Sequence, residues 1–334
     1  MPETFPFSAI VGQDDMKMAL LLNAIDRRIG GVLIFGTRGT GKSTAVRALA
    51  NLLPPLEAIE GCPIHAATEA DVPGWASLTS YKTINIPTPV VDLPLGASED
   101  RVTGALDIEK ALSKGEKAFQ PGLLAEANRG FLYIDEINLL EDHIIDLLLD
   151  VAQSGENLIE RDGLSIRHAA SFVLIGSGNP EEGELRPQLL DRFGLAVDVG
   201  NPNNIQERVE VLKRRDAFDQ NPQAFLDNYH NHDMAIRERI IKAQALLKDI
   251  KVPDEALTDI ANLCMTIGSD GLRGELTLLR SARAQAAWCG DEHVTREHIT
   301  TVAGMALQHR LRRDPLDEAS GLARVQRSMK QVFG

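Results

Sequence analysis

The fold is decided by Gly36-Thr37-Arg38-Gly39-Thr40-Gly41-Lys42-Ser43, which matches the pattern G-x-x-x-x-G-K-[ST]. An apolar run, Gly31–Phe35, comes directly before it, and a helical pattern starts at Thr44 directly after it. Glycines let the backbone curl so that successive N–H groups converge on a phosphate, and the following helix start adds a positive dipole end. We therefore predict that Lys42 neutralises the β and γ oxygens of a nucleotide and that Ser43 binds Mg²⁺.

A second apolar run, Phe131–Ile134, ends in two acids, Asp135 and Glu136. At the carboxyl end of a parallel strand, such carboxylates face the ligand crevice of the sheet. Asp135 fits the Mg²⁺ ligand, and Glu136 fits the base that orients an attacking water. An acid pair after a strand also commonly caps the next helix. The strong phosphate-binding pattern upstream favours the catalytic interpretation.

Two further segments could complete a nucleotide site. Asn179 follows the apolar run Ser171–Ile175, and its amide could hold water or the γ-phosphate, although a plain Gly-Asn-Pro turn is the alternative. Leu185–Phe193 offers Arg186 and Arg192, which spacing alone leaves as ordinary ion-pair residues. Only in an oligomer would either arginine reach a neighbour's phosphate as a finger.

The order of these patterns predicts an α/β domain with a mostly parallel sheet over residues 1–200 and an all-helical domain over 201–334. Prolines interrupt residues 61–105, which we interpret as an insertion of extended segments and loops. The predicted strands are Gly31–Phe35, Gly130–Ile134, Ser171–Ile175 and Leu195–Val199. The predicted helices are Thr44–Leu53, Asp142–Gln153, Ile205–Arg215, Met234–Leu247, Asp254–Thr266, Leu272–Cys289 and Thr295–Leu311.

Composition and charge exclude several other classes of protein. The chain has 334 residues and a formal net charge of −13, whereas proteins that bind nucleic acid usually carry a basic face. The first residues show no signal or transit peptide, and no run approaches the length of a membrane span, so we expect a cytoplasmic protein without one. Basic residues from Arg310 to Lys330 predict a solvated helix face, or else a contact with another subunit.

Cysteine and histidine give no sign of a further metal site. Cys62, Cys264 and Cys289 lack C-x-x-C spacing, which indicates reduced thiols. The eight histidines form no H-E-x-x-H motif and no tight cluster with acids or cysteines along the chain. The predicted metal ligands are therefore Ser43 and Asp135 alone, and the predicted cofactors are ATP and Mg²⁺.

These motifs occur in the order found in AAA+ ring ATPases, and the chain resembles that superfamily over almost its whole length. Longer stretches closely resemble the family of the magnesium chelatase ATPase (I) subunit. These stretches are Val91–Val102, Gly122–Gly130, Gly178–Phe193 and His309–Leu316. The resemblance implies ATP-driven insertion of Mg²⁺ into protoporphyrin IX, on the route to chlorophyll or bacteriochlorophyll, and a bacterial phototroph as the source.

The same resemblance implies partners and residue roles. The I subunit forms a ring, hexameric in most accounts, and works with a D subunit and with an H subunit that alone binds the porphyrin. Carried over, Arg192 is the arginine finger, Asn179 the first sensor and Arg273 the second sensor from the helical lid. Ile10–Gln13 resembles the segment near adenine. The family's hairpin insertions fit residues 61–105 and Glu160–His168.

Two other classes of protein stay open, and a close relative of the I subunit is disfavoured by the residues present. The related D subunit usually has a degraded phosphate loop and an added domain with Asp-x-Ser-x-Ser, whereas here the loop is intact and that pentapeptide is absent. A MoxR-like AAA+ ATPase would remodel a protein partner and have no connection with pigment synthesis. A DNA-translocating helicase shares the insertion topology but is disfavoured by the acidic charge.

Overall fold

The computed structural model describes residues 3–37, 39–114, 118–161, 163–179, 183, 185–202, 204–269, 271–311 and 320–334. Arg38 of the phosphate-binding pattern therefore lies outside the described residues. The chain divides into two compact units. Unit 1 comprises Met1–Leu52 and Gly178–Gly334, and unit 2 comprises Leu53–Ser177. The predicted division into residues 1–200 and 201–334 stays a prediction.

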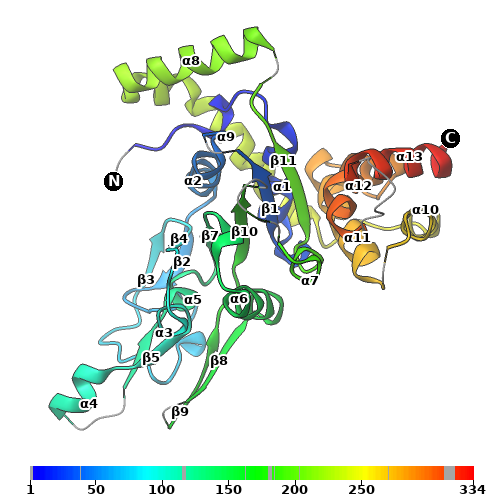
Figure 1. The fold of residues 1–334 in the computed structure, drawn as a ribbon. Helices are drawn as coiled ribbons and strands as arrows, with labels where there is room; N and C mark the ends of the chain where they lie inside the picture. The colour runs from blue at the N-terminus through cyan, green and yellow to red at the C-terminus, as the bar shows by residue number, and fades with distance from the viewer. Residues whose placement is uncertain are drawn as a thin grey trace. The chain divides into compact units, whose positions relative to one another are not determined.

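The central sheet has five strands in the order β11-β1-β10-β7-β4 (Figure 1). Their bounds are Val32–Gly36 (β1), Val90–Leu93 (β4), Phe131–Ile134 (β7), Val173–Gly178 (β10) and Leu195–Val199 (β11). Strand β1 runs parallel to β11, and β7 runs parallel to both β10 and β4. Buried residues fill β7 and β10, as expected of strands covered on both faces. The predicted parallel sheet is confirmed.

Strand β4 is the member of the sheet that the sequence analysis does not predict, because it lies inside the proline-rich residues 61–105. Pro89 stands directly before it and Pro94 directly after it. Proline cannot donate to a strand ladder, so it is tolerated at the ends of strands and at sheet edges. The last place of β4 in the strand order is such an edge.

Unit 1 holds β1, β11 and most of the helices, and α10 to α13 pack against one another in it (Figure 1). Its helices are α1 (Asp14–Ile25), α2 (Lys42–Leu52), α7 (Pro187–Leu190), α8 (Ile205–Gln220), α9 (Pro222–Leu246), α10 (Asp254–Ile267), α11 (Arg273–Cys289), α12 (Arg296–Leu307) and α13 (Gly321–Phe333), with short 3-10 turns η1 (Phe7–Ala9), η2 (Arg27–Ile29) and η6 (Gln308–Arg310). The predicted helical C-terminal part is confirmed. No helix among the described residues is long and apolar enough to cross a membrane.

Helix caps explain where the longest helices of unit 1 begin and end. Asn204 caps α8, and Asn221 caps α9 by accepting the N–H of Ala224, with Pro222 at the first helical position. Gly268 and Gly290 end α10 and α11 in the left-handed conformation. The predicted helix Met234–Leu247 begins later than α9 does, because the first half of α9 carries too few apolar residues to show a periodic face.

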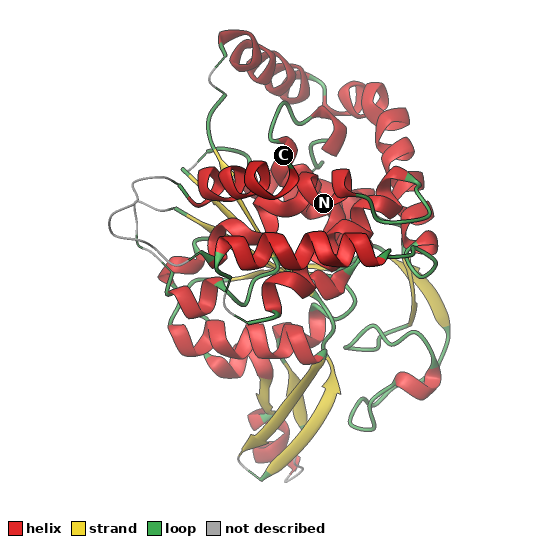
Figure 2. Cartoon of the chain, turned by 90° about the vertical axis from the view of Figure 1, so that its right-hand side faces the viewer, coloured by secondary structure: helices red, strands yellow, loops and turns green. Residues whose placement is uncertain are grey.

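Unit 2 adds three small antiparallel hairpins to its sheet strands (Figures 1 and 2). The hairpins are β2 (Leu56–Ile59) with β3 (Thr83–Ile86), β5 (Gly104–Leu106) with β6 (Phe119–Pro121), and β8 (Glu156–Arg161) with β9 (Leu164–Ala169). The helices are α3 (Glu99–Thr103), α4 (Ile108–Lys114), α5 (Leu123–Glu126) and α6 (Asp142–Ser154), with turns η3 (Glu69–Asp71) and η4 (Ile137–Leu139). The predicted hairpin insertions are thus present.

Candidate functional site

The phosphate-binding loop joins β1 to α2 within unit 1. Gly39 and Gly41 have φ angles of +81° and +82°, a region in which glycine is free and other residues are strained. A Cβ added at either would meet no atom within 4 Å, so the loop presents an open face there. Gly36 differs, because its Cβ would lie 2.2 Å from the carbonyl oxygen of Val199 on β11. The first glycine therefore serves strand packing, and the other two shape the loop.

Lys42 lies across its own loop. Its Nζ donates to the carbonyl oxygen of Gly36 at 2.6 Å and to that of Thr37 at 3.0 Å. Ser43 is the second residue of α2, so its hydroxyl belongs to a helix N-terminus, where partial positive charge favours anions. The left-handed glycines, the lysine and the helix start are arranged as a phosphate-binding loop requires, and the roles of Lys42 and Ser43 stay predictions.

The acidic pair lies at the end of β7 in unit 2, inside a network of hydroxyl groups. Ser177 Oγ donates to Asp135 Oδ1 at 2.6 Å, and Tyr133 OH donates to the same oxygen at 3.0 Å. The backbone N–H of Glu136 donates to Ser177 Oγ at 3.2 Å. Glu136 itself has a left-handed φ of 55°, which costs energy for a residue other than glycine. The network thus fixes the Asp135 carboxylate and the backbone that aims Glu136.

Ser177 and Tyr133 are functional candidates that the sequence reasoning missed. Both are buried, and burial raises the pKa of Tyr133 above its ordinary value, so the phenol remains a hydrogen-bond donor. A readable signal existed for Tyr133, since residues two apart on a strand share a face and Tyr133 precedes Asp135 by two. Ser177 could be found only through the pairing of β10 with β7, in which Gly176 lies opposite Ile134.

The remaining predicted site residues lie in unit 1. Asn179 follows β10 and is 7% exposed. Arg192 follows α7, and Arg273 is the first residue of α11. Arg273 Nη1 donates to Asp191 Oδ2 at 2.8 Å, so the structure brings the predicted second sensor to the residue preceding the predicted finger.

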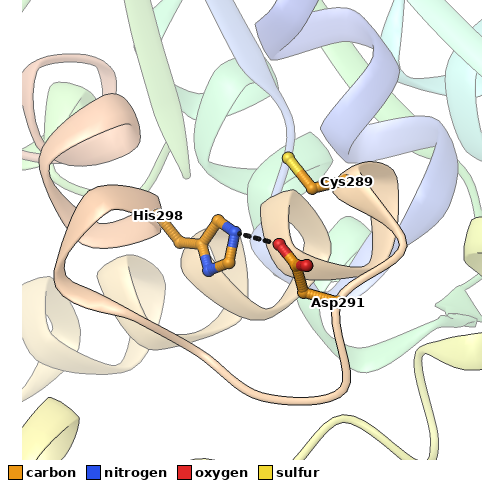
Figure 3. Close-up of side chains that lie close together, drawn as sticks. All are labelled: Cys289, Asp291 and His298. Atoms are coloured by element: carbon orange, nitrogen blue, oxygen red, sulfur yellow. Dashed lines mark hydrogen bonds and ion pairs between the residues drawn. The ribbon is translucent and has the colours of Figure 1, made fainter.

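A group of three potential metal ligands also occurs among the described residues: Cys289, Asp291 and His298 (Figure 3). The prediction that the histidines form no tight cluster with acids or cysteines is wrong, because the turn between α11 and α12 brings these three residues together. His298 Nδ1 accepts the backbone N–H of Thr295 at 3.1 Å and completes the N-terminal cap of α12. Its Nε2 therefore carries the proton and lies 3.0 Å from Asp291 Oδ2.

This arrangement does not suit a metal ion. A ligating imidazole needs a free nitrogen lone pair, and neither nitrogen of His298 offers one. Burial and the Asp291 carboxylate also raise the pKa of the Cys289 thiol, whereas the thiolate is the metal ligand. Within this group, His298 completes the cap of α12, and Asp291 holds the other side of its ring. The hydroxyl of Ser43 in unit 1 and the carboxylate of Asp135 in unit 2 are each hard oxygen donors of the kind that Mg²⁺ prefers, and their role as Mg²⁺ ligands stays a prediction.

Comparisons with known proteins show the family to which the chain is similar. Residues 107–189 match the family model described as "Magnesium chelatase, subunit ChlI", and residues 257–329 match an AAA lid domain. The magnesium-chelatase 38 kDa subunit of Cereibacter sphaeroides is 65% identical, and the alignment covers 100% of both chains. The identity concerns the whole length and not only the phosphate loop.

Two solved structures resemble the chain. One belongs to a complex of subunits BchI and BchD of magnesium chelatase, built from a single-particle cryo-EM reconstruction. It has 66% identity and a TM-score of 0.59, and the match covers 94% of this chain and 98% of that one. A Cytophaga hutchinsonii protein has a TM-score of 0.66 at 17% identity over 97% of this chain and 91% of its own, which shows the shared fold.

Proposed function

The chain belongs to the magnesium chelatase subunit I family, and from that premise we propose that it is the ATP-hydrolysing subunit of a magnesium chelatase. The observation that carries the proposal is 65% identity to such a subunit over its full length. The loop Gly36–Ser43 supports it as well, since Gly39 and Gly41 have left-handed φ angles and Lys42 lies across the loop, as nucleotide binding requires. Hydrolysis would drive the insertion of Mg²⁺ into protoporphyrin IX.

Within this function, each predicted residue has a defined task. Lys42 neutralises the β and γ oxygens of ATP, and Ser43 with Asp135 holds the Mg²⁺ that accompanies it. Glu136 orients the attacking water, and Asn179 senses the γ-phosphate. The hydroxyl groups of Tyr133 and Ser177, which donate to the Asp135 carboxylate and orient it, support this assignment. The bound Mg²⁺ would neutralise charge that develops on the transferred phosphoryl group.

We further propose that the chain works as a ring, six-membered as in its family, in which Arg192 serves the nucleotide of a neighbouring subunit. Arg273 would act from the lid. The BchI–BchD complex among its relatives supports a D subunit as partner. Protoporphyrin IX would be bound by an H subunit. Placement in the cytoplasm of a bacterial phototroph and the absence of a nucleic-acid partner stay predictions.

The test is reconstitution. The purified chain, D and H subunits, protoporphyrin IX and Mg·ATP should together give Mg-protoporphyrin, followed by its absorption and fluorescence. The chain alone should hydrolyse ATP and insert no metal, because we propose that the porphyrin is bound by the H subunit. Metal insertion by the single chain would refute this division of labour. A complete mixture that hydrolyses ATP without making Mg-protoporphyrin would point instead to remodelling of another protein.

A further inference from the structure

The buried side chain of Arg310 makes an unusual set of contacts in unit 1. Its guanidinium is 2% exposed and donates five hydrogen bonds, which is every N–H that an arginine side chain has. Nε binds the carbonyl oxygen of Ala306 at 3.0 Å on the preceding turn of the chain. Nη2 also lies 3.2 Å from Thr277 Oγ1 on α11. The side chain is therefore anchored to two helices.

The other bonds of Arg310 all go to the two residues that flank Arg192. Nη1 donates to Asp191 Oδ1 at 2.6 Å and also to the Asp191 carbonyl oxygen. Nη2 donates to the Phe193 carbonyl oxygen at 2.6 Å. A planar guanidinium that binds carbonyls on both sides of one residue fixes the position of that residue's backbone. The solvated position expected for Arg310 is thus wrong.

Neighbouring groups add further contacts that hold the Arg192 segment in place. His309 Nε2 donates to the Phe193 carbonyl oxygen at 3.1 Å, and the Phe193 ring is fully buried. Asp191 divides its carboxylate between Arg310 on Oδ1 and Arg273 on Oδ2. Burying an arginine is costly unless it is fully paired, and burial lowers the pKa of Arg310 while Asp191 opposes that change. A buried arginine that is paired in this way holds the segment that it contacts in place.

We propose that Arg310 is a positioning residue for Arg192, holding the finger segment to α11 and the end of α12. The proposal rests on the proposed function of Arg192 as a finger that serves a neighbouring subunit. The segment must be held closely, because a shift of about 1 Å at a catalytic group costs about 10²-fold in rate. In this proposal Arg310 holds the backbone on both sides of Arg192 in place and does not itself contact the nucleotide.

The test uses Arg310→Lys in the full-length chain. Lysine keeps the charge but cannot bind both carbonyls, so we expect unchanged ATP binding and about a 10²-fold lower ATPase rate. Arg296→Lys is the matched control, since that arginine is 57% exposed and pairs with Asp259 on the surface. It should hydrolyse ATP at the wild-type rate.

Mixing variants shows whether Arg310 acts through the finger. A chain with Glu136→Gln keeps its finger, so its mixture with Arg310→Lys should exceed the sum of the separate ATPase rates. A mixture of Arg310→Lys with Arg192→Ala should not, because both chains lack a working finger. Arg192→Ala mixed with Glu136→Gln tests the finger itself and should regain activity.

The two proposals fail in different ways. If Arg192→Ala with Glu136→Gln regains no activity, the shared site is wrong. If that pair regains activity but Arg310→Lys complements Arg192→Ala, or fails to complement Glu136→Gln, the positioning role is wrong. An Arg310→Lys chain without a cooperative thermal transition, or one with the wild-type rate, would also overturn it.

Discussion

The phosphate loop and the Arg192 segment both belong to unit 1, and they are held in opposite ways. Lys42 binds carbonyl oxygens of its own loop, five and six residues away in sequence. The Arg192 segment is held by His309 and Arg310, which lie 116 to 119 residues from the carbonyls they bind. A site made of residues that are close together in the sequence can be recognised from the sequence. A site held by residues that are far apart in the sequence depends on the fold around it.

Lys42→Ala should have the largest effect, because Lys42 is the residue proposed to neutralise the β and γ oxygens of ATP. We expect ATP binding and hydrolysis both to fall below detection, since the lysine charge acts in ground state and transition state alike. Equilibrium binding of a fluorescent ATP analogue and phosphate release measure the two separately. The variant should still fold. Near-normal ATP turnover would show that the loop Gly36–Ser43 is not part of the nucleotide site.

Arg192→Ala should separate binding from hydrolysis, which Lys42→Ala does not. ATP binding should persist while turnover falls by about 10³–10⁵-fold, as for other fingers supplied by a neighbour. Mixing with Lys42→Ala should restore part of the rate, because a mixed interface can join the intact loop of one chain to the intact finger of the other. A monomeric protein, or mixtures that only add, would contradict a shared site.

Ser177→Ala tests whether hydroxyl groups matter at the acidic end of unit 2. The loss of a hydrogen bond to a carboxylate is worth about 1.5–3 kcal/mol, so we expect a fall in kcat of about 10- to 10²-fold with ATP binding retained. Tyr133→Phe removes the other donor to Asp135 Oδ1 and should have a similar or smaller effect. Ser113→Ala changes an exposed serine and serves as the control. Equal ATPase rates in all three variants would show that the hydrogen bonds to Asp135 do not contribute to catalysis.

His309→Gln should have the smallest effect, confined to the pH dependence of stability. Burial lowers the pKa of His309 to about 3, and the nearby charge of Arg310 lowers it as well, while the hydrogen bond to Phe193 opposes this change. Among the described groups, Nδ1 of His309 is buried without a hydrogen-bond partner. The unfolded chain binds a proton near pH 6.5, so wild-type stability should fall as the pH drops from there toward 3. The slope is about 1.4 kcal/mol per pH unit for this one group.

Glutamine can still donate to Phe193 but does not titrate, so this component should vanish in His309→Gln. Urea unfolding between pH 7 and 5 measures the difference from wild type. His143→Gln replaces an exposed histidine and should retain the wild-type slope. A wild-type slope in His309→Gln would show that this histidine is not responsible.

Sequence reasoning reached the parts of the molecule whose signal is local. The loop Gly36–Ser43, the strand before it and the helix after it could all be predicted, because each depends on residues close together along the chain. Several helices of unit 1, α2, α8 and α10 to α12, were also readable from their periodicity, whereas α1 and α13 were not predicted and a polar first half concealed the start of α9. The long-range partners were not readable. Nothing in the sequence indicates that Arg310 is buried against Asp191 and Phe193, or that Ser177 binds Asp135, because strand register and helix packing decide both.

The close approach of Gly36 to β11 has an evolutionary consequence. A side chain at that position would collide with the carbonyl oxygen of Val199 whether or not a nucleotide is ever bound. A gene copy freed from the need to hydrolyse ATP could therefore lose Gly39, Gly41 and Lys42 without harm to its sheet, while Gly36 would still be kept by selection for folding. In such a descendant, the surviving first glycine would record inherited architecture and not retained enzyme activity.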